Sequence, residues 1–167
     1  MTETTYSTIG MNTTSKGKAA ALVVFKLRKM GVPAQEVTDN PYFDVVAFPF
    51  GQTIRIKLRP TESNDKRGVM RFRLTTGVYG EEKRPYNLTD ADLVAFVALH
   101  LEAVTFLACI DLTEIINITK SRFEKDVILG DSFALECQKV WNATGLFDPP
   151  KKQRKKRIIP DPKTPVW

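Results

Sequence analysis

Soft metal ligands are scarce in this sequence. Its 167 residues include two cysteines, Cys109 and Cys137, which form no CxxC pair, and a single histidine, His100. A zinc finger or a zinc hydrolase needs more cysteine and histidine ligands than these. His100 lies in the apolar run 93–101, where a histidine is more often a core or strand-end residue than a catalytic base. Zinc enzymes and Ser-His-Asp or Cys-His hydrolases are therefore disfavoured, and we expect both cysteines to be buried thiols.

The sequence also lacks a secretory signal and an uninterrupted membrane span. Residues 1–18 contain no basic segment followed by an apolar stretch, which predicts a cytoplasmic protein. The most apolar window, residues 93–112, is interrupted by His100 and Glu102. Charge in the middle of the window favours a buried β-hairpin over a transmembrane helix. We therefore expect no membrane partner.

The composition is that of an ordinary folded domain. Hydrophobic residues make up 43% of the chain and charged residues 26%, which argues against wholesale disorder and fibrous structure. The length suits one domain, for which we predict the bounds 15–148. A flexible N-terminal arm is expected at residues 1–14 and a basic disordered tail at residues 149–167.

Positive charge is concentrated at the C-terminal end. The net charge is +6, and residues 148–167 hold seven lysines and arginines against two aspartates. Runs of like charge repel themselves and bind polyanions, so the tail is expected to bind nucleic acid largely independently of base sequence. A localisation signal or a solubility tail is the alternative. The tail cations are Lys151, Lys152, Arg154, Lys155, Lys156 and Arg157.

Hydrophobic periodicity predicts an α+β fold. Apolar residues recur at helical spacing over 15–30, and a second helix is expected at 132–142. The segments 92–99 and 103–110 are apolar on both faces, as in strands buried between layers. Residues 113–130 are not assigned. Shorter strands are predicted at 35–38, 42–48, 53–59 and 69–75.

Basic residues alternate with apolar ones within 53–59 and 69–74. Because successive side chains of a strand point to opposite faces, we predict a sheet with one apolar face and an opposite row of cations. An exposed polar face without any ligand is the alternative. The predicted row consists of Arg55, Lys57, Arg59, Arg71 and Arg73.

Asp44 and Lys57 fall on neighbouring predicted strands, on either side of a turn at 49–51. Metal-assisted phosphodiester hydrolysis uses such a pair. The carboxylate holds a divalent cation, and the lysine orients the attacking water or stabilises developing charge. The spacing permits this chemistry, with a turn or surface role for Asp44 as the alternative.

Four short motifs occur in a characteristic order. They are the helix start Gly-Lys-Ala-Ala-Ala at 17–21, Asn-Pro-Tyr-Phe-Asp-Val-Val at 40–46, Ile-Arg-Ile-Lys-Leu-Arg at 54–59, and the hairpin 92–107. Together they resemble the PD-(D/E)XK nuclease superfamily, and within it the group I intron homing endonuclease type, over about residues 15–112. The resemblance implies a restriction-endonuclease-like, α/β/α-like fold, with a central mixed sheet of about five to six strands flanked by helices. It also implies Mg²⁺ as cofactor if the protein cleaves, a homodimer or homotetramer, and a phage or mobile-element setting.

The same resemblance assigns roles to individual residues. Asp44 matches the metal-binding aspartate and Lys57 the catalytic lysine. Two positions depart from the pattern, because Arg55 replaces the Glu, Asp or Gln two residues before the lysine and Lys18 replaces an acid of the first helix. A guanidinium cannot ligate Mg²⁺, and a cation at that position is expected to compete with the metal for Asp44.

One carboxylate then remains at the predicted metal site. Glu62, Asp39 and Asp90 are further acidic residues, but no spacing brings them to Asp44. We therefore favour a nucleic-acid-binding protein, with DNA as the expected partner, that keeps the nuclease fold without cleavage.

Two alternatives stay open. The first is an active divalent-metal-dependent DNA endonuclease with Asp44, Lys57 and Arg55 at its site. The second is a protein-interaction or assembly module on the same fold. DNA binding through phosphates, to which Lys18 and the strand and tail cations would contribute, falls with salt. Only the endonuclease needs a divalent metal.

Overall fold

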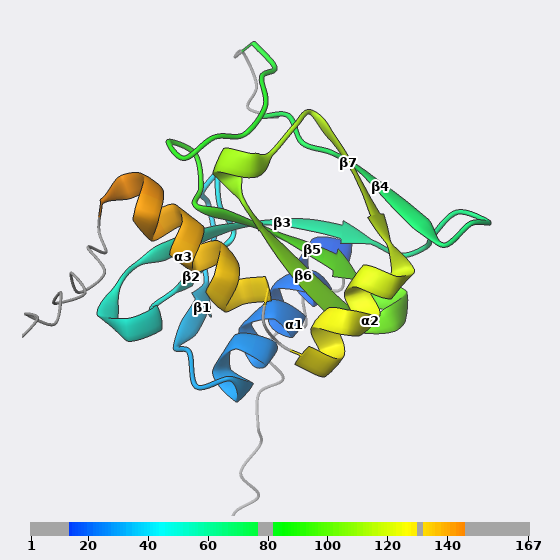
Figure 1. The fold of residues 1–167 in the computed structure, drawn as a ribbon, viewed down its shortest axis with the longest axis horizontal. Helices are drawn as coiled ribbons and strands as arrows, with labels where there is room; N and C mark the ends of the chain where they lie inside the picture. The colour runs from blue at the N-terminus through cyan, green and yellow to red at the C-terminus, as the bar shows by residue number, and fades with distance from the viewer. Residues whose placement is uncertain (1–13, 77–81, 130–131, 146–167) are drawn as a thin grey trace, which may run out of the picture.

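The computed structural model describes residues 14–76, 82–129 and 132–145 (Figure 1). The predicted arm, apart from Thr14, and the predicted tail with its six cations lie outside the described residues. These described residues form three α-helices and seven strands, joined in part by short 3-10 turns. In chain order they are α1 (Ser15–Lys29), β1 (Ala34–Glu36), β2 (Val45–Ala47), β3 (Ile54–Thr61), β4 (Val69–Arg73), β5 (Leu93–Ala98), β6 (Ala103–Ala108), β7 (Ile115–Thr119), α2 (Lys120–Leu129) and α3 (Ser132–Thr144).

Five of the strands form a central mixed sheet. Its order is β1-β2-β3-β5-β6, in which β3 and β5 are parallel and every other neighbouring pair is antiparallel. Strands β4 and β7 pair with each other in a separate two-stranded sheet. The predicted α+β fold, with a central mixed sheet of about five to six strands flanked by helices, is therefore confirmed, and the sheet has five strands.

Helix α1 forms because its sequence supplies a cap, an apolar stripe and a stop. The Thr14 hydroxyl accepts a hydrogen bond from the Gly17 amide at 3.1 Å, which caps the first turn. Ala20, Val23 and Leu27 lie on the buried side. Gly31 follows the helix with φ +81°, a conformation that glycine adopts without strain. The chain then turns into β1 beside the same helix.

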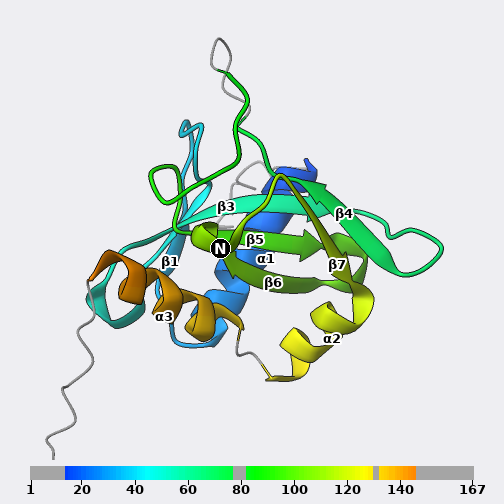
Figure 2. The ribbon, with the colours of Figure 1, turned by 45° about the horizontal axis from the view of Figure 1, so that its top comes forward.

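The two faces of the central sheet are covered differently (Figure 2). On one face, Ile54, Ile56 and Leu58 of β3 belong to a core cluster shared with α1 and α3. On the other face, Phe96 packs with Phe72 of β4, with ring centroids 4.8 Å apart. The second sheet and α2 thus cover the face opposite to α1.

The predicted single row of strand cations is wrong. Arg71 and Arg73 are exposed on β4, whose apolar side chains face the central sheet. Lys57 and Arg59 instead share a face of the central sheet with Val94 and Phe96, their partners across β3 and β5. The alternation within each strand was correct. The strands do not pair, because β4 takes β7, in the unassigned stretch 113–130, as its partner.

Both cysteines are buried, as predicted. Burial raises the pKa of each thiol to about 12, so both are protonated at neutral pH. No helix within the described ranges is long and apolar enough to cross a lipid bilayer.

Replacing Phe96 by alanine tests the packing between the two sheets. Phe96 is completely buried, so we expect Phe96→Ala to lower the free energy of unfolding by about 3–5 kcal/mol, measured by urea denaturation. Phe25→Ala is the matched control, because Phe25 is 62% exposed on α1. A change within about 0.5 kcal/mol is expected there. Equal losses in the two variants would contradict this packing.

Candidate functional site

Asp44 lies at the centre of the candidate site and is held by hydrogen bonds to β3. It directly precedes β2, and its amide donates to the Ile56 carbonyl of β3 at 2.9 Å. Its carboxylate oxygen Oδ2 accepts the Leu58 amide, also at 2.9 Å. The residue is 2% exposed. The backbone of β3 therefore holds a buried carboxylate in one orientation.

Lys57 reaches this carboxylate from β3. Its ammonium lies 3.3 Å from Asp44 Oδ2 and donates to the Pro41 carbonyl at 3.1 Å. That carbonyl belongs to a turn in which Asn40 Oδ1 accepts the Tyr42 amide at 2.8 Å. Burial lowers the pKa of Lys57, and the charge of Asp44 opposes this shift. The structure thus brings together the two residues that the sequence motifs paired.

A second lysine, Lys16, also contacts Asp44. Its ammonium lies 2.6 Å from Asp44 Oδ1, and its side chain is 61% exposed. Sequence analysis missed Lys16 and singled out Lys18, two residues further along α1. Lys18 is exposed and lines a separate cavity with Glu62, His100 and Glu102. Two residues correspond to about 200° of helical turn, so only one of the two lysines faces Asp44.

Arg59 and Tyr86 lie next to Lys57. The Arg59 guanidinium carbon lies 5.1 Å from the centroid of the buried Tyr86 ring, and the Lys57 ammonium lies 6.0 Å from it. Arg59 Nη2 donates to the Thr75 carbonyl at 3.3 Å. Its Nε is buried without a hydrogen-bond partner among the described residues. Sequence analysis did not single out Tyr86, which lies outside every predicted strand and helix.

Arg55 does not compete for Asp44, and this sequence expectation is wrong. Its guanidinium forms two hydrogen bonds with the Asp92 carboxylate, at 3.1 and 3.0 Å, and donates to the Leu88 carbonyl at 2.6 Å. The parallel pairing of β3 and β5 explains this, because the Asp92 amide donates to the Arg55 carbonyl. The bond to Asp92 raises the pKa of Arg55. Its observed contacts tie the loop before β5 to β3.

The other acidic residues considered from the sequence do not join the site. Glu62 accepts a hydrogen bond from the Ser15 hydroxyl. Asp90 is held by both terminal nitrogens of Arg84, at 2.7 and 2.8 Å. Asp39 lies in the loop between β1 and β2 with a left-handed backbone, φ 63°.

These contacts decide whether a divalent metal fits. Across residues 14–76, 82–129 and 132–145, no three His, Cys, Asp or Glu residues cluster as metal ligands. Asp44 offers one carboxylate, which two ammonium groups already neutralise. A metal ion needs several oxygen ligands and is repelled by adjacent cations. The residues present therefore do not fit Mg²⁺.

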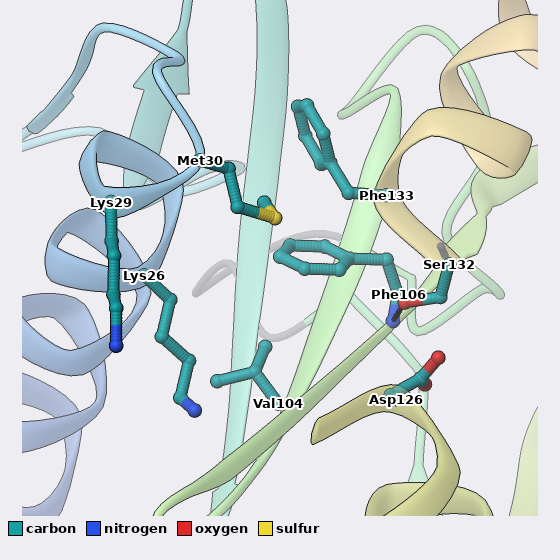
Figure 3. A pocket seen from close by; sticks show the side chains of 8 residues that line it. All are labelled: Lys26, Lys29, Met30, Val104, Phe106, Asp126, Ser132 and Phe133. Atoms are coloured by element: carbon teal, nitrogen blue, oxygen red, sulfur yellow. Dashed lines mark hydrogen bonds between the residues drawn. The ribbon is translucent and has the colours of Figure 1, made fainter. Parts of the chain in front are cut away.

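A cavity of about 310 Å³ lies on the opposite face of the sheet, between α1, β6 and α3 (Figure 3). Its floor is apolar, formed by Val104, Phe106 and Phe133, with Lys26 at its side. The described lining contains one carboxylate, that of Asp126, which accepts a hydrogen bond from the Thr105 hydroxyl. This cavity is separate from the Asp44 site.

Comparison with solved structures finds proteins of similar fold. The chain superimposes on a bacterial homing endonuclease, I-Ssp6803I, with a TM-score of 0.56 and 20% sequence identity, over 80% of this chain and 97% of that one. It also matches Hjc, a Holliday junction resolvase from Archaeoglobus fulgidus, with a TM-score of 0.44 and 14% identity, over 66% and 88% of the two chains. No protein-family model and no curated protein matches the sequence. The likeness to the PD-(D/E)XK nuclease fold, predicted from the motifs, is confirmed at the level of structure.

Alanine substitution tests the structural role of Arg55. We expect Arg55→Ala to lower the free energy of unfolding by about 1–3 kcal/mol, because Asp92 and the Leu88 carbonyl lose their charged donor. Urea denaturation measures the loss. Arg71→Ala, on the exposed face of β4, is the matched control and should change stability by no more than about 0.5 kcal/mol. Unchanged stability in Arg55→Ala would contradict the structural role.

Proposed function

We propose that this protein binds DNA on a PD-(D/E)XK nuclease fold without metal-dependent cleavage. The observation that carries the proposal is the pairing of Lys16 and Lys57 with the single carboxylate of Asp44. An oxygen-rich cluster that could hold a catalytic metal is lacking in the described part of the chain. The fold itself, shared with a homing endonuclease, supports DNA as the partner.

The charge balance at the site favours a phosphate ligand. Lys16, Lys57 and Arg59 contribute three positive charges against the one negative charge of Asp44. Arg59 lies over the Tyr86 ring, and its side chain is half-buried. A guanidinium donates several hydrogen bonds from one plane, which suits the oxygens of a phosphodiester. We therefore assign Arg59 a phosphate-binding role.

Cations outside this site are proposed as additional DNA contacts. Arg71 and Arg73 are exposed on β4, separate from the Asp44 site. The tail cations at 151–157 and Lys18 would add affinity that is independent of base sequence. Each contact of this kind makes binding weaker as salt rises.

Assembly with a second copy is the other candidate function. Phe50 is 89% exposed and lies edge-on to Trp141, with ring centroids 6.2 Å apart. Leu135 of α3 is 63% exposed. An apolar cavity of about 310 Å³ lies beside Phe50, between the β2–β3 turn and α3. These residues favour a protein contact at this end of the molecule.

One assay on supercoiled plasmid separates these functions. The protein is incubated with Mg²⁺, Mn²⁺ or EDTA, and nicking and gel shift are read from the same samples. We expect a salt-sensitive shift in EDTA and no nicking with either metal. Lys57→Ala should weaken the shift and reduce the slope of log affinity against log salt by about 0.9, the value for one lost phosphate contact.

Lys125→Ala, an exposed lysine of α2, serves as the matched control and should bind as the unmodified protein does. If nicking occurs, Asp44→Ala shows whether the Asp44 site of this protein is responsible for it. Metal-dependent nicking that Asp44→Ala abolishes would establish an active endonuclease and overturn the proposal. Absence of any shift would instead leave assembly as the function.

A further inference from the structure

Lys16 occupies a position that its own helix disfavours. It lies in the first turn of α1, which contains no acidic residue. The amino end of a helix carries partial positive charge, so acidic side chains are stabilising there and lysines are not. The side chain nevertheless reaches Asp44, at 2.6 Å. The buried carboxylate, and not the helix, therefore accounts for a cation at this position.

The two oxygens of Asp44 have different surroundings. Oδ2 accepts the Leu58 amide and lies 3.3 Å from the Lys57 ammonium. Oδ1 is 3.4 Å from that ammonium and 2.6 Å from the Lys16 ammonium. Oδ1 is thus the oxygen with no backbone donor in the described structure, and Lys16 provides its shortest contact. A cation from solution has to displace Lys16 to reach it.

We propose that Lys16 is a built-in substitute for a metal ion, holding a positive charge on Asp44 Oδ1 and presenting it to a DNA phosphate. The second half of this statement rests on the proposed DNA binding, and the first half does not. The 61% exposure of the Lys16 side chain leaves its ammonium accessible from solvent. Lys16 then reaches a phosphodiester from α1, with the buried Lys57 behind it on β3.

Exchanging the charge of Lys16 tests the metal substitution. Lys16→Glu brings a second carboxylate to Asp44, and repulsion between the two should lower the melting temperature in EDTA. Mn²⁺ at millimolar concentration should raise that temperature by on the order of 5 °C, because the two carboxylates share the ion. The unmodified protein and Lys16→Arg, which keeps the cation, should show no such rise. Thermal unfolding of the full chain measures all three.

Asp44→Asn in the Lys16→Glu background is the matched control and should abolish the response to Mn²⁺. Two results would overturn the proposal that Lys16 substitutes for a metal. One is a Mn²⁺-induced rise in melting temperature in the unmodified protein equal to that in Lys16→Glu, and the other is no such rise in Lys16→Glu. If Lys16→Glu does not fold, Lys16→Met replaces it. Because methionine adds no oxygen ligand, this fallback also carries Lys57→Gln, which replaces the second ammonium by an amide oxygen. The double variant should show a smaller rise in melting temperature with Mn²⁺ that Asp44→Asn again abolishes, and no rise would overturn the substitution.

A gel shift in EDTA tests the phosphate contact separately. We expect Lys16→Met to reduce the slope of log affinity against log salt by about 0.9 and to leave one phosphate contact fewer. An unchanged slope would overturn the contact with DNA. If the unmodified protein shows no shift at all, the proposed function and the phosphate contact fail together, while the response of Lys16→Glu to Mn²⁺ still decides the metal substitution.

Discussion

The carboxylate of Asp44, which directly precedes β2, joins two elements of the fold, β3 and α1. It accepts the Leu58 amide of β3, pairs with Lys57 of the same strand, and receives Lys16 from α1. A buried carboxylate is stable only when opposite charge and hydrogen-bond donors surround it. Here the protein supplies both from its own side chains and backbone. The chemistry available at the site depends on this arrangement.

In the proposed function, the charges around Asp44 allow binding of DNA without cleavage. A site that holds a metal keeps its carboxylates free for the ion, whereas Asp44 already has two ammonium partners. Arg55, which departs from the nuclease pattern at a ligand position, is held by Asp92 and contributes to folding. Arg59 and Tyr86 extend a surface whose net charge suits phosphates. The fold resembles that of a homing endonuclease, and two ammonium groups surround the carboxylate that a catalytic metal would need.

The fold class and the pairing of Asp44 with Lys57 were predictable from short motifs, because these two residues keep their spacing around the turn between β2 and β3. Alternation identified β3 and β4 but not the pairing of β3 with β5 or of β4 with β7, since register between distant strands leaves no local signal. The role of Lys16 depends on the rotation of α1, which sequence fixes only to within a residue or two. The pairing of Arg55 with Asp92 required the parallel register of β3 and β5. A lysine in the first turn of a helix was the one available signal for Lys16.

The central claim is that the lysines exclude divalent metal from Asp44 in the unmodified protein. Titration of Mn²⁺ into isotopically labelled protein tests this directly, because the paramagnetic ion broadens the amide resonances of nearby residues. The amides of Asp44 and Leu58 report on the carboxylate, and that of Phe72, between the two sheets, serves as reference. The account predicts that equimolar Mn²⁺ broadens the amide resonances of Asp44 and Leu58 no more than that of Phe72. Selective broadening of Asp44 and Leu58 would contradict it.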